Sequence, residues 1–268
     1  LMKKARRLLR PIGAVLATAA VLVALGFVER NVDRTPVSAL KITVKGGEGV
    51  HFVDEAMVRR NVLDQGTSVM GVPLGDLDVP GIEERLRNDP SVASAEVYHT
   101  MDGVLHVSVV QREPVVRVFN QDGTSFYIDS EGWTMPTSAH YTARVLVVTG
   151  ALNEPGVRDG VHSVYGPDSM QQVLLSDDIH RLAMHIRQDP LWNALIDQVV
   201  VDPYGDLELI PKVGAQRIML GDGTELAPRF EKLRLFYRKG IPQADWRRYA
   251  RIDLRFADQV VCTKRTTP

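Results

Sequence analysis

An uncharged, apolar run near the beginning of the chain restricts the possible topology more than any other feature. Ile12–Val28 contains no charged residue over 17 positions. Five cations precede it, namely Lys3, Lys4, Arg6, Arg7 and Arg10. The length of the run is at the lower limit for a helix that crosses a hydrocarbon core of about 30 Å. The pattern predicts a single transmembrane helix at 12–28 that follows a basic tail at 1–11.

Two alternatives exist for this run. A cleaved signal peptide also combines a basic start with an apolar stretch, but this run is longer than a usual signal core, and no small-x-small cleavage site follows before Glu29. A buried core helix is disfavoured, because the run is uniformly apolar and directly follows a cluster of cations. An uncleaved anchor is therefore favoured. The positive-inside rule then predicts a cytoplasmic N-terminus, with the chain from about residue 30 onward outside.

Composition excludes several classes of protein. The formal net charge of −1 argues against a nucleic-acid binder that works through bulk charge, so no nucleic-acid partner is expected. A single cysteine, Cys262, excludes an intrachain disulfide framework and a zinc site built from cysteines. A hydrophobic content of 44% excludes a disordered chain.

Residues 39–112 show the pattern of a small α+β module. Periodicity and turn signals predict, in chain order, a strand at 39–45, helices at 54–64 and 80–89, and strands at 92–100 and 104–111. The last two strands are joined at Met101-Asp102-Gly103, which is a strong hairpin signal. The helices are expected on one face of a three-stranded sheet, where they bury Val58, Val62, Ile82 and Leu86.

Residues 113–264 are rich in strand patterns, with two helices among them, and a tail follows at 265–268. Strands are predicted at 115–119, 125–129, 144–148, 196–202, 206–211, 216–220 and over 249–264, and helices at 169–188 and 228–239. The expected fold class for the whole chain is α+β: a transmembrane helix, a βααββ module, and a mixed antiparallel β domain with flanking helices.

No pattern in the chain indicates catalysis. His180 and His185, two of the seven histidines, are five positions apart, which is the wrong spacing for two ligands on one helix face. Asp177-Asp178 begins a predicted helix, where carboxylates complement the dipole, and is interpreted as capping. The motifs His-Glu-x-x-His and Gly-x-Ser-x-Gly do not occur. We expect no catalytic residue, no cofactor and no metal.

Several short motifs together resemble a known family. The module carries Pro90-Ser91-Val92, the strand Leu105–Val109 and Arg112-Glu113-Pro114-Val115, and in this it resembles a POTRA domain. Further matches follow in order at Asp122-Gly123, Asp129, Gly132, Pro136, Leu220-Gly221 and Ile252-Asp253-Leu254-Arg255. Along nearly its whole length the chain resembles the bacterial cell-division family FtsQ/DivIB.

The resemblance implies a non-catalytic scaffold of the divisome, located in the inner membrane at the division septum, with a periplasmic C-terminus. Its implied partners are the membrane-anchored coiled-coil proteins FtsB and FtsL, other divisome proteins and the lipid around the anchor. Through these partners it would be linked to septal peptidoglycan synthesis. The alternative is a different POTRA-bearing envelope protein that binds unfolded or outer-membrane protein substrates.

The end of the chain is the candidate partner-binding site. No segment follows the last strand to cover its outer side, and Lys264 is the kind of charge that blunts an exposed edge. The resemblance implies that the stretch after Leu254-Arg255-Phe256 pairs with FtsB. The aromatic residues nearby fit either a core or a partner surface. The candidate residues are Trp246, Tyr249, Phe256, Asp258, Gln259, Val260, Val261, Cys262 and Lys264.

Three further expectations concern this site. Residues 257–259 form either a β-bulge or a turn. Val261→Pro is expected to remove an N–H group that pairs with the partner strand while leaving the fold intact. The resemblance also implies a basic contact residue in the strands before Leu220-Gly221, yet Val199–Ile210 contains neither arginine nor lysine.

Overall fold

The computed structural model describes residues 19–20, 32–47, 49–63, 68–158, 160–166, 174–240 and 248–265. Contacts divide the chain into two units, of which the first holds Leu1–Lys45 and Val53–Gln111 and the second holds Gly46–Phe52 and Arg112–Pro268. The transmembrane helix predicted at 12–28 and the basic tail lie outside the described residues, apart from positions 19 and 20. Within the described ranges, no helix is both long and apolar enough to cross a bilayer.

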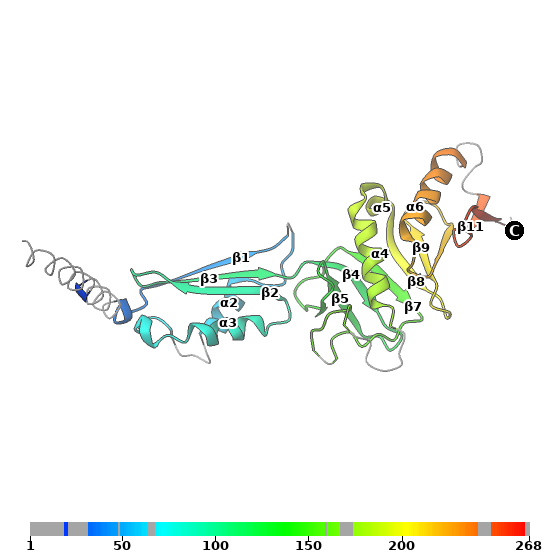
Figure 1. Ribbon diagram of the computed structural model, residues 1–268. Helices are drawn as coiled ribbons and strands as arrows, with labels where there is room; N and C mark the ends of the chain where they lie inside the picture. Colours follow the sequence, from blue (N-terminus) through cyan, green and yellow to red (C-terminus); the bar gives the residue numbers. More distant parts are fainter. Residues whose placement is uncertain are drawn as a thin grey trace, which may run out of the picture. The chain divides into compact units, whose positions relative to one another are not determined.

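The first unit has the expected order of strand, helix, helix, strand, strand (Figure 1). Its elements are β1 (Ala39–Lys45), α2 (Glu55–Val62), the 3-10 turn η2 (Leu74–Asp76), α3 (Val79–Arg87), β2 (Val92–His99) and β3 (Val104–Gln111). The strand order is β1-β3-β2, with β3 parallel to β1 and antiparallel to β2.

Capping residues and apolar spacing explain the two helices of this unit. The side chain of Asp54 accepts a hydrogen bond from Met57 N at the start of α2, and the side chain of Asp78 accepts one from Gly81 N at the start of α3. Figure 1 shows both helices on one face of the three-stranded sheet. The four side chains predicted to be buried are at most 2% exposed: Val58, Val62, Ile82 and Leu86. The predicted layout of this unit is confirmed.

The second unit is built on a nine-stranded mixed sheet with the order β12-β11-β10-β9-β8-β7-β4-β5-β6. Its strands are β4 (Pro114–Phe119), β5 (Ser125–Asp129), β6 (Thr134–Pro136), β7 (Leu146–Gly150), β8 (Ile196–Val201), β9 (Leu207–Pro211), β10 (Arg217–Gly221), β11 (Tyr249–Asp253) and β12 (Val261–Lys264). Its helices are α4 (Ser176–Gln188), α5 (Pro190–Leu195), α6 (Leu226–Leu235) and the π-helical turn η3 (Phe236–Gly240).

The expected α+β class is correct, but the second sheet is less antiparallel than expected. Three of its neighbouring pairs are parallel: β4 with β7, β7 with β8, and β10 with β11. Helices α4 and α5 connect β7 to β8, and α6 connects β10 to β11. Because a parallel pair requires a crossover connection, these helices account for two of the three parallel pairs.

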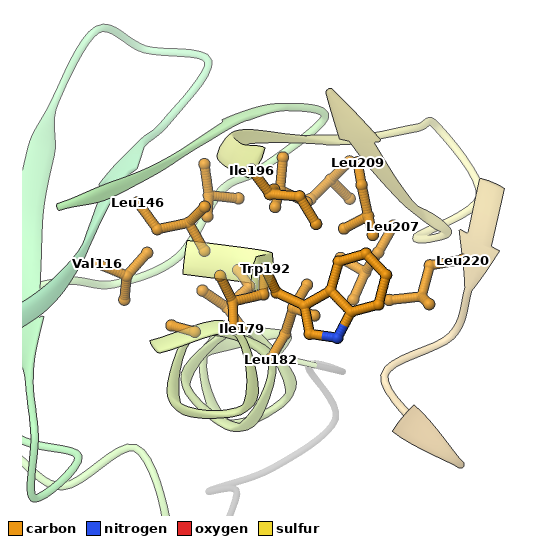
Figure 2. Packing of buried hydrophobic residues seen from close by; sticks show 14 of the residues in the cluster. Val116, Leu146, Ile179, Leu182, Trp192, Ile196, Leu207, Leu209 and Leu220 are labelled. Carbon is orange, nitrogen blue, oxygen red and sulfur yellow. The ribbon is translucent and has the colours of Figure 1, made fainter. Parts of the chain in front are cut away.

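Helix α4, which lies within the helix predicted at 169–188, packs against this sheet through apolar residues at i, i+3, i+4 and i+7. Ile179, Leu182, Ala183 and Ile186 are all at most 2% exposed. Figure 2 shows Ile179 and Leu182 facing the strand residues of the same core. The first part of the predicted helix, through residue 173, lies outside the described residues.

Asp177 and Asp178 lie in the first turn of α4, where carboxylates were expected to complement the dipole, but neither provides the capping hydrogen bond. The buried carboxylate of Glu154 accepts hydrogen bonds from Leu175 N and Ser176 N, both at 3.1 Å. The two aspartates instead form ion pairs with Arg181 one turn further along the helix. The cap comes from a residue distant in sequence, so local pattern could not reveal it.

A short helix and a short strand were not predicted. Helix α5 begins at Pro190, a residue that suits the first turn of a helix; Asp189 is its N-cap and accepts a hydrogen bond from Leu191 N at 2.9 Å. It places Trp192 in the core (Figure 2) at 1% exposure. The ring of Trp192 lies 5.2 Å from that of Phe230. The strand is β6, which has only three residues.

Candidate functional site: the terminal edge of the second sheet

Strand β12 forms one end of the nine-stranded sheet and is paired on one side only. It runs antiparallel to β11, with Cys262 opposite Ile252 and Val261 opposite Asp253. Among the described residues, no segment lies along its outer side. The strand therefore presents a free row of backbone hydrogen-bonding groups, as expected for an edge strand.

The opposite end of the sheet is closed. Along β6, Thr134 N donates to His162 O at 2.9 Å, and Val164 N donates to Gly132 O at 2.8 Å. An isolated bridge between Trp133 and Ser163 completes this cover. The two edges thus differ: β6 has backbone bonds to the segment at 162–164, and β12 has no neighbour on its outer side in the part of the chain that the structure describes.

The flank toward which each N–H group of β12 points follows from the hydrogen bond of Arg265, the residue directly after the strand. Arg265 N donates to Arg248 O, on the β11 side, at 2.6 Å. Successive residues of a strand point their backbone groups to opposite flanks, so the N–H groups of Thr263 and Val261 also face β11. The N–H groups of Cys262 and Lys264 then face the free flank. The Val261 N–H was expected on the free flank, but by this geometry it faces β11, and the Cys262 N–H faces the free flank.

The two faces of β12 have different environments. Val260 and Cys262 are half-buried against the core of the second unit, whereas Val261 is 40% exposed. Burial raises the pKa of the Cys262 thiol, so the neutral form predominates near neutral pH. Cys262 therefore acts as a small apolar side chain at the margin of the core.

The connection between β11 and β12 is a turn with a bend at 256–258, which settles the alternative between a bulge and a turn. The strand predicted over 249–264 is interrupted, because β11 ends at Asp253 and β12 begins only at Val261. Leu254 is fully buried, and its N–H donates to Met219 O at 2.9 Å. Phe256 lies in the turn and is 45% exposed.

An ion-pair cluster holds the start of this turn. The guanidinium of Arg255 donates to Asp253 Oδ2 at 2.8 Å and to Asp206 Oδ2 at 2.9 Å. These hydrogen bonds raise the pKa of Arg255. Burial opposes ionisation of Asp253, but hydrogen bonds from Arg255 outweigh it and lower the pKa of this carboxyl. Gly221, at φ +88°, lies under the stem of Arg255, whose Cγ is 2.9 Å from the position of an added Cβ.

The chain matches two sequence profiles of known families. A sequence profile described as FtsQ/DivIB, C-terminal related, matches residues 113–263, more than half of the chain. The chain belongs to the FtsQ/DivIB family. A second profile, described as a POTRA-like domain, matches residues 37–110, so the first unit of this FtsQ/DivIB protein contains a POTRA-like domain.

Two curated relatives bear the name cell division protein FtsQ. The protein from Rhodothermus marinus is 28% identical over 204 residues, which cover 74% of this chain and 70% of that protein. The protein from Salinibacter ruber is 26% identical over 264 residues, which cover 97% of this chain and 95% of that protein. The chain is thus a POTRA-bearing member of a family of cell division proteins.

The structure brings most of the candidate residues of this FtsQ/DivIB protein into one hairpin. Tyr249, Val261, Cys262 and Lys264 lie in its two strands, and Phe256, Asp258, Gln259 and Val260 lie in the connecting turn. Trp246 lies outside the described residues. Tyr249 is half-buried, with its ring 5.9 Å from that of Phe236, so it contributes to the core as well as to the edge.

Sequence reasoning missed two residues that shape this site. Lys232 on α6 donates to Leu254 O at 2.8 Å and also to Phe256 O, which fixes the turn before β12. Arg217 begins β10, the strand that leads to Leu220-Gly221; it pairs with Glu208 at 3.0 Å and its side chain is 64% exposed. No local signal could have revealed Lys232, because its acceptors lie more than twenty positions away.

The histidines singled out for ligand spacing lie in structural contacts. His180 Nδ1 is 2.6 Å from the hydroxyl of Tyr165, and burial lowers the pKa of His180. The ring of His185 packs against Phe230 with centroids 4.6 Å apart, and burial lowers its pKa as well. In the part of the chain that the structure describes, no group of three metal-ligating side chains comes together.

Proposed function

We propose that this FtsQ/DivIB protein is a non-catalytic scaffold of the divisome and that strand β12 accepts an extended segment of FtsB. The free edge of β12 supports this proposal more than any other observation. An incoming strand gains affinity from main-chain hydrogen bonds and specificity from the side chains that alternate along it. The proposal includes FtsL and other divisome proteins as further partners, and through them a link to septal peptidoglycan synthesis.

Three features of the edge favour an ordered docking site. The turn before β12 is fixed by Lys232 and by the Arg255 ion pairs, so little conformational entropy is lost when a partner pairs there. Cys262 is half-buried and would be covered by an apolar side chain of the partner. Arg251 on β11, the strand next to β12, lies opposite Arg217 on β10, so two cations lie near the edge for an acidic group of the partner.

We further propose the domain boundaries 39–112 for the POTRA-like domain and 113–264 for the FtsQ-type β domain. The helix at 12–28 would anchor both in the inner membrane at the division septum, with the N-terminus in the cytoplasm and the C-terminus in the periplasm. The five cations before Pro11 support this orientation.

A topology experiment tests the membrane part of the proposal. A reporter that is active only in the periplasm, fused after Pro268, should be active, and the full-length chain should stay with the membrane fraction in high salt. Salt leaves a hydrophobic anchor in place, whereas it removes proteins held by charge alone. A soluble, shortened form that begins near residue 30 would show instead that the segment is a cleaved signal peptide.

The binding mechanism is tested by two substitutions at one position. Cys262→Pro removes the N–H group that faces the free flank of β12, and edge strands tolerate proline. We expect this variant to keep its fold and to bind FtsB at least about tenfold more weakly. The loss of one backbone hydrogen bond of roughly 1.4 kcal/mol raises the dissociation constant by that factor. The measurement is the dissociation constant for the periplasmic part of FtsB, with the full chain in detergent.

The matched control is Cys262→Val, which keeps the N–H group and an apolar side chain of similar size. Its affinity for FtsB should equal that of the unmodified chain. Val261→Pro should instead disturb the β11–β12 pairing, because that N–H group faces β11. Normal capture of FtsB by a folded Cys262→Pro chain would rule out strand addition at β12. Broad binding of outer-membrane protein peptides would favour the alternative of a substrate-holding envelope protein.

A further inference from the structure

A cleft of about 870 Å³ lies in the second unit, away from the β11–β12 hairpin. All of its lining residues belong to that unit. Its walls are the C-terminal half of α4, the junction of α5 and β8, the start of β4, and the extended segment 141–147 that leads into β7. No candidate residue of the partner-binding edge lines it.

The segment 141–145 along this cleft leads into β7 with the alternating burial of a strand, but among the described residues it has no strand neighbour. Tyr141, Ala143 and Val145 are half-buried on an apolar cluster with Phe52 and Tyr127. The alternate positions 142 and 144 are exposed. Among the described residues, the backbone groups of 142–144 have no hydrogen-bond partner. The segment is thus an unpaired extension of β7.

The neighbouring elements explain why β7 is not paired there. In the parallel register of β4 and β7, Val116 lies opposite Leu146, which places Pro114 opposite Arg144. A proline has no N–H group and cannot continue the ladder. On the other flank, the register of β7 with β8 would place Leu195 at this level, but Leu195 belongs to helix α5.

The charges of the cleft leave one cation without a counter-ion. Arg187 forms an ion pair with Glu113, and Lys212 lies 3.9 Å from Asp197. Arg144 forms neither an ion pair nor a hydrogen bond with any described residue. Three cations therefore face two carboxylates around an open stretch of strand-like backbone.

We propose that this cleft binds an extended, acidic segment of another polypeptide. The segment pairs with the backbone of 142–144 and places a carboxylate against Arg144. Backbone pairing provides the affinity that an extended peptide gains at any free strand. The carboxylate provides the selectivity, because a guanidinium binds a carboxylate through two parallel hydrogen bonds. This site is separate from β12 and does not depend on the function proposed for that edge.

The test uses three synthetic peptides and the full-length chain in detergent. The acidic probe is Ac-Thr-Glu-Val-Glu-Thr-NH2, the basic probe replaces both glutamates with lysine, and the third probe replaces the central valine with proline. We expect the acidic probe to bind with a measurable dissociation constant, and the other two to bind at least tenfold more weakly. The proline probe isolates the contribution of backbone pairing.

Substitutions in the chain locate the binding site. Arg144→Glu should weaken binding of the acidic probe at least tenfold and strengthen binding of the basic probe. Arg158→Glu makes the same change of charge at an exposed position outside the cleft and should alter neither affinity. Cys262→Pro should also leave the acidic probe unaffected, so that failure here and failure at β12 can be told apart.

Four outcomes would overturn the proposal. If Arg144→Glu left the affinity for the acidic probe unchanged, the probe would bind outside the cleft. If no binding were detected at millimolar peptide, the cleft would not be a site for acidic segments. Equal binding of the proline probe would show that strand pairing plays no part. Self-association of the chain that is lost in Arg144→Glu, without peptide binding, would identify a second copy as the occupant.

Discussion

Leu86→Asp should unfold the first unit at room temperature. Leu86 is fully buried between α3 and the three-stranded sheet. Loss of a buried leucine side chain costs about 2–5 kcal/mol, and an unpaired carboxylate in its place adds several more. The total is comparable with the whole stability of a small domain, about 5–15 kcal/mol. The measurement is hydrogen exchange of the full-length chain, read at the amides of β2 and β3.

Arg87→Asp is the matched control. It introduces the same side chain at the next position of α3, where Arg87 is 53% exposed and pairs with Glu83. Loss of such a surface pair costs about 1 kcal/mol or less, so the amides of β2 and β3 should remain protected. Native protection in Leu86→Asp would mean that α3 does not pack on the sheet through this face.

Trp192→Ala should lower the free energy of unfolding of the second unit by about 3–5 kcal/mol. Trp192 is 1% exposed, its ring meets Phe230 at 5.2 Å, and the guanidinium of Arg234 lies 5.3 Å from its centroid. The alanine leaves a large cavity under α6, and the neighbouring side chains can close it only in part. Urea unfolding of the full chain, followed by circular dichroism, gives the free energy.

Leu191→Ala tests whether this loss comes from the core. Leu191 precedes Trp192 in the same short helix but is 44% exposed. Its substitution should change the free energy of unfolding by about 0.5 kcal/mol or less, as for most surface positions. Similar losses at the two positions would mean that α5 contributes through its helix propensity and not through the tryptophan.

The free edge of β12 depends on how the rest of the second sheet is finished. A sheet of nine strands has two ends, and the segment at 162–164 covers β6 with backbone hydrogen bonds. At the other end of this sheet, β12 has no strand neighbour on its outer side within the described residues. An edge that is short and flanked by Lys264 and Arg265 resists indiscriminate pairing, which suits a site reserved for one partner.

Part of the candidate site was predictable because its signals are local. The alternation of apolar residues around Ile252 indicates a strand, and the charges of Lys264 and Arg265 indicate an exposed end. The direction of the N–H groups could not be predicted, because it depends on the pairing between Arg265 and Arg248. Neither could the end of β11 at Asp253, which follows from the hydrogen bond between Leu254 and Met219.

The sequence by itself determined the elements of the first unit and most of those in the second. Asp54 and Asp78 cap helices within their own turns, and the hairpin at 101–103 joins adjacent strands, so each signal lies close to the structure it specifies. Only the tertiary structure decided the order of the nine strands, the cap that Glu154 provides for α4, and the unpaired segment before β7. Each of these depends on groups that are far apart in the chain, and their hydrogen bonds form only after the sheet has assembled.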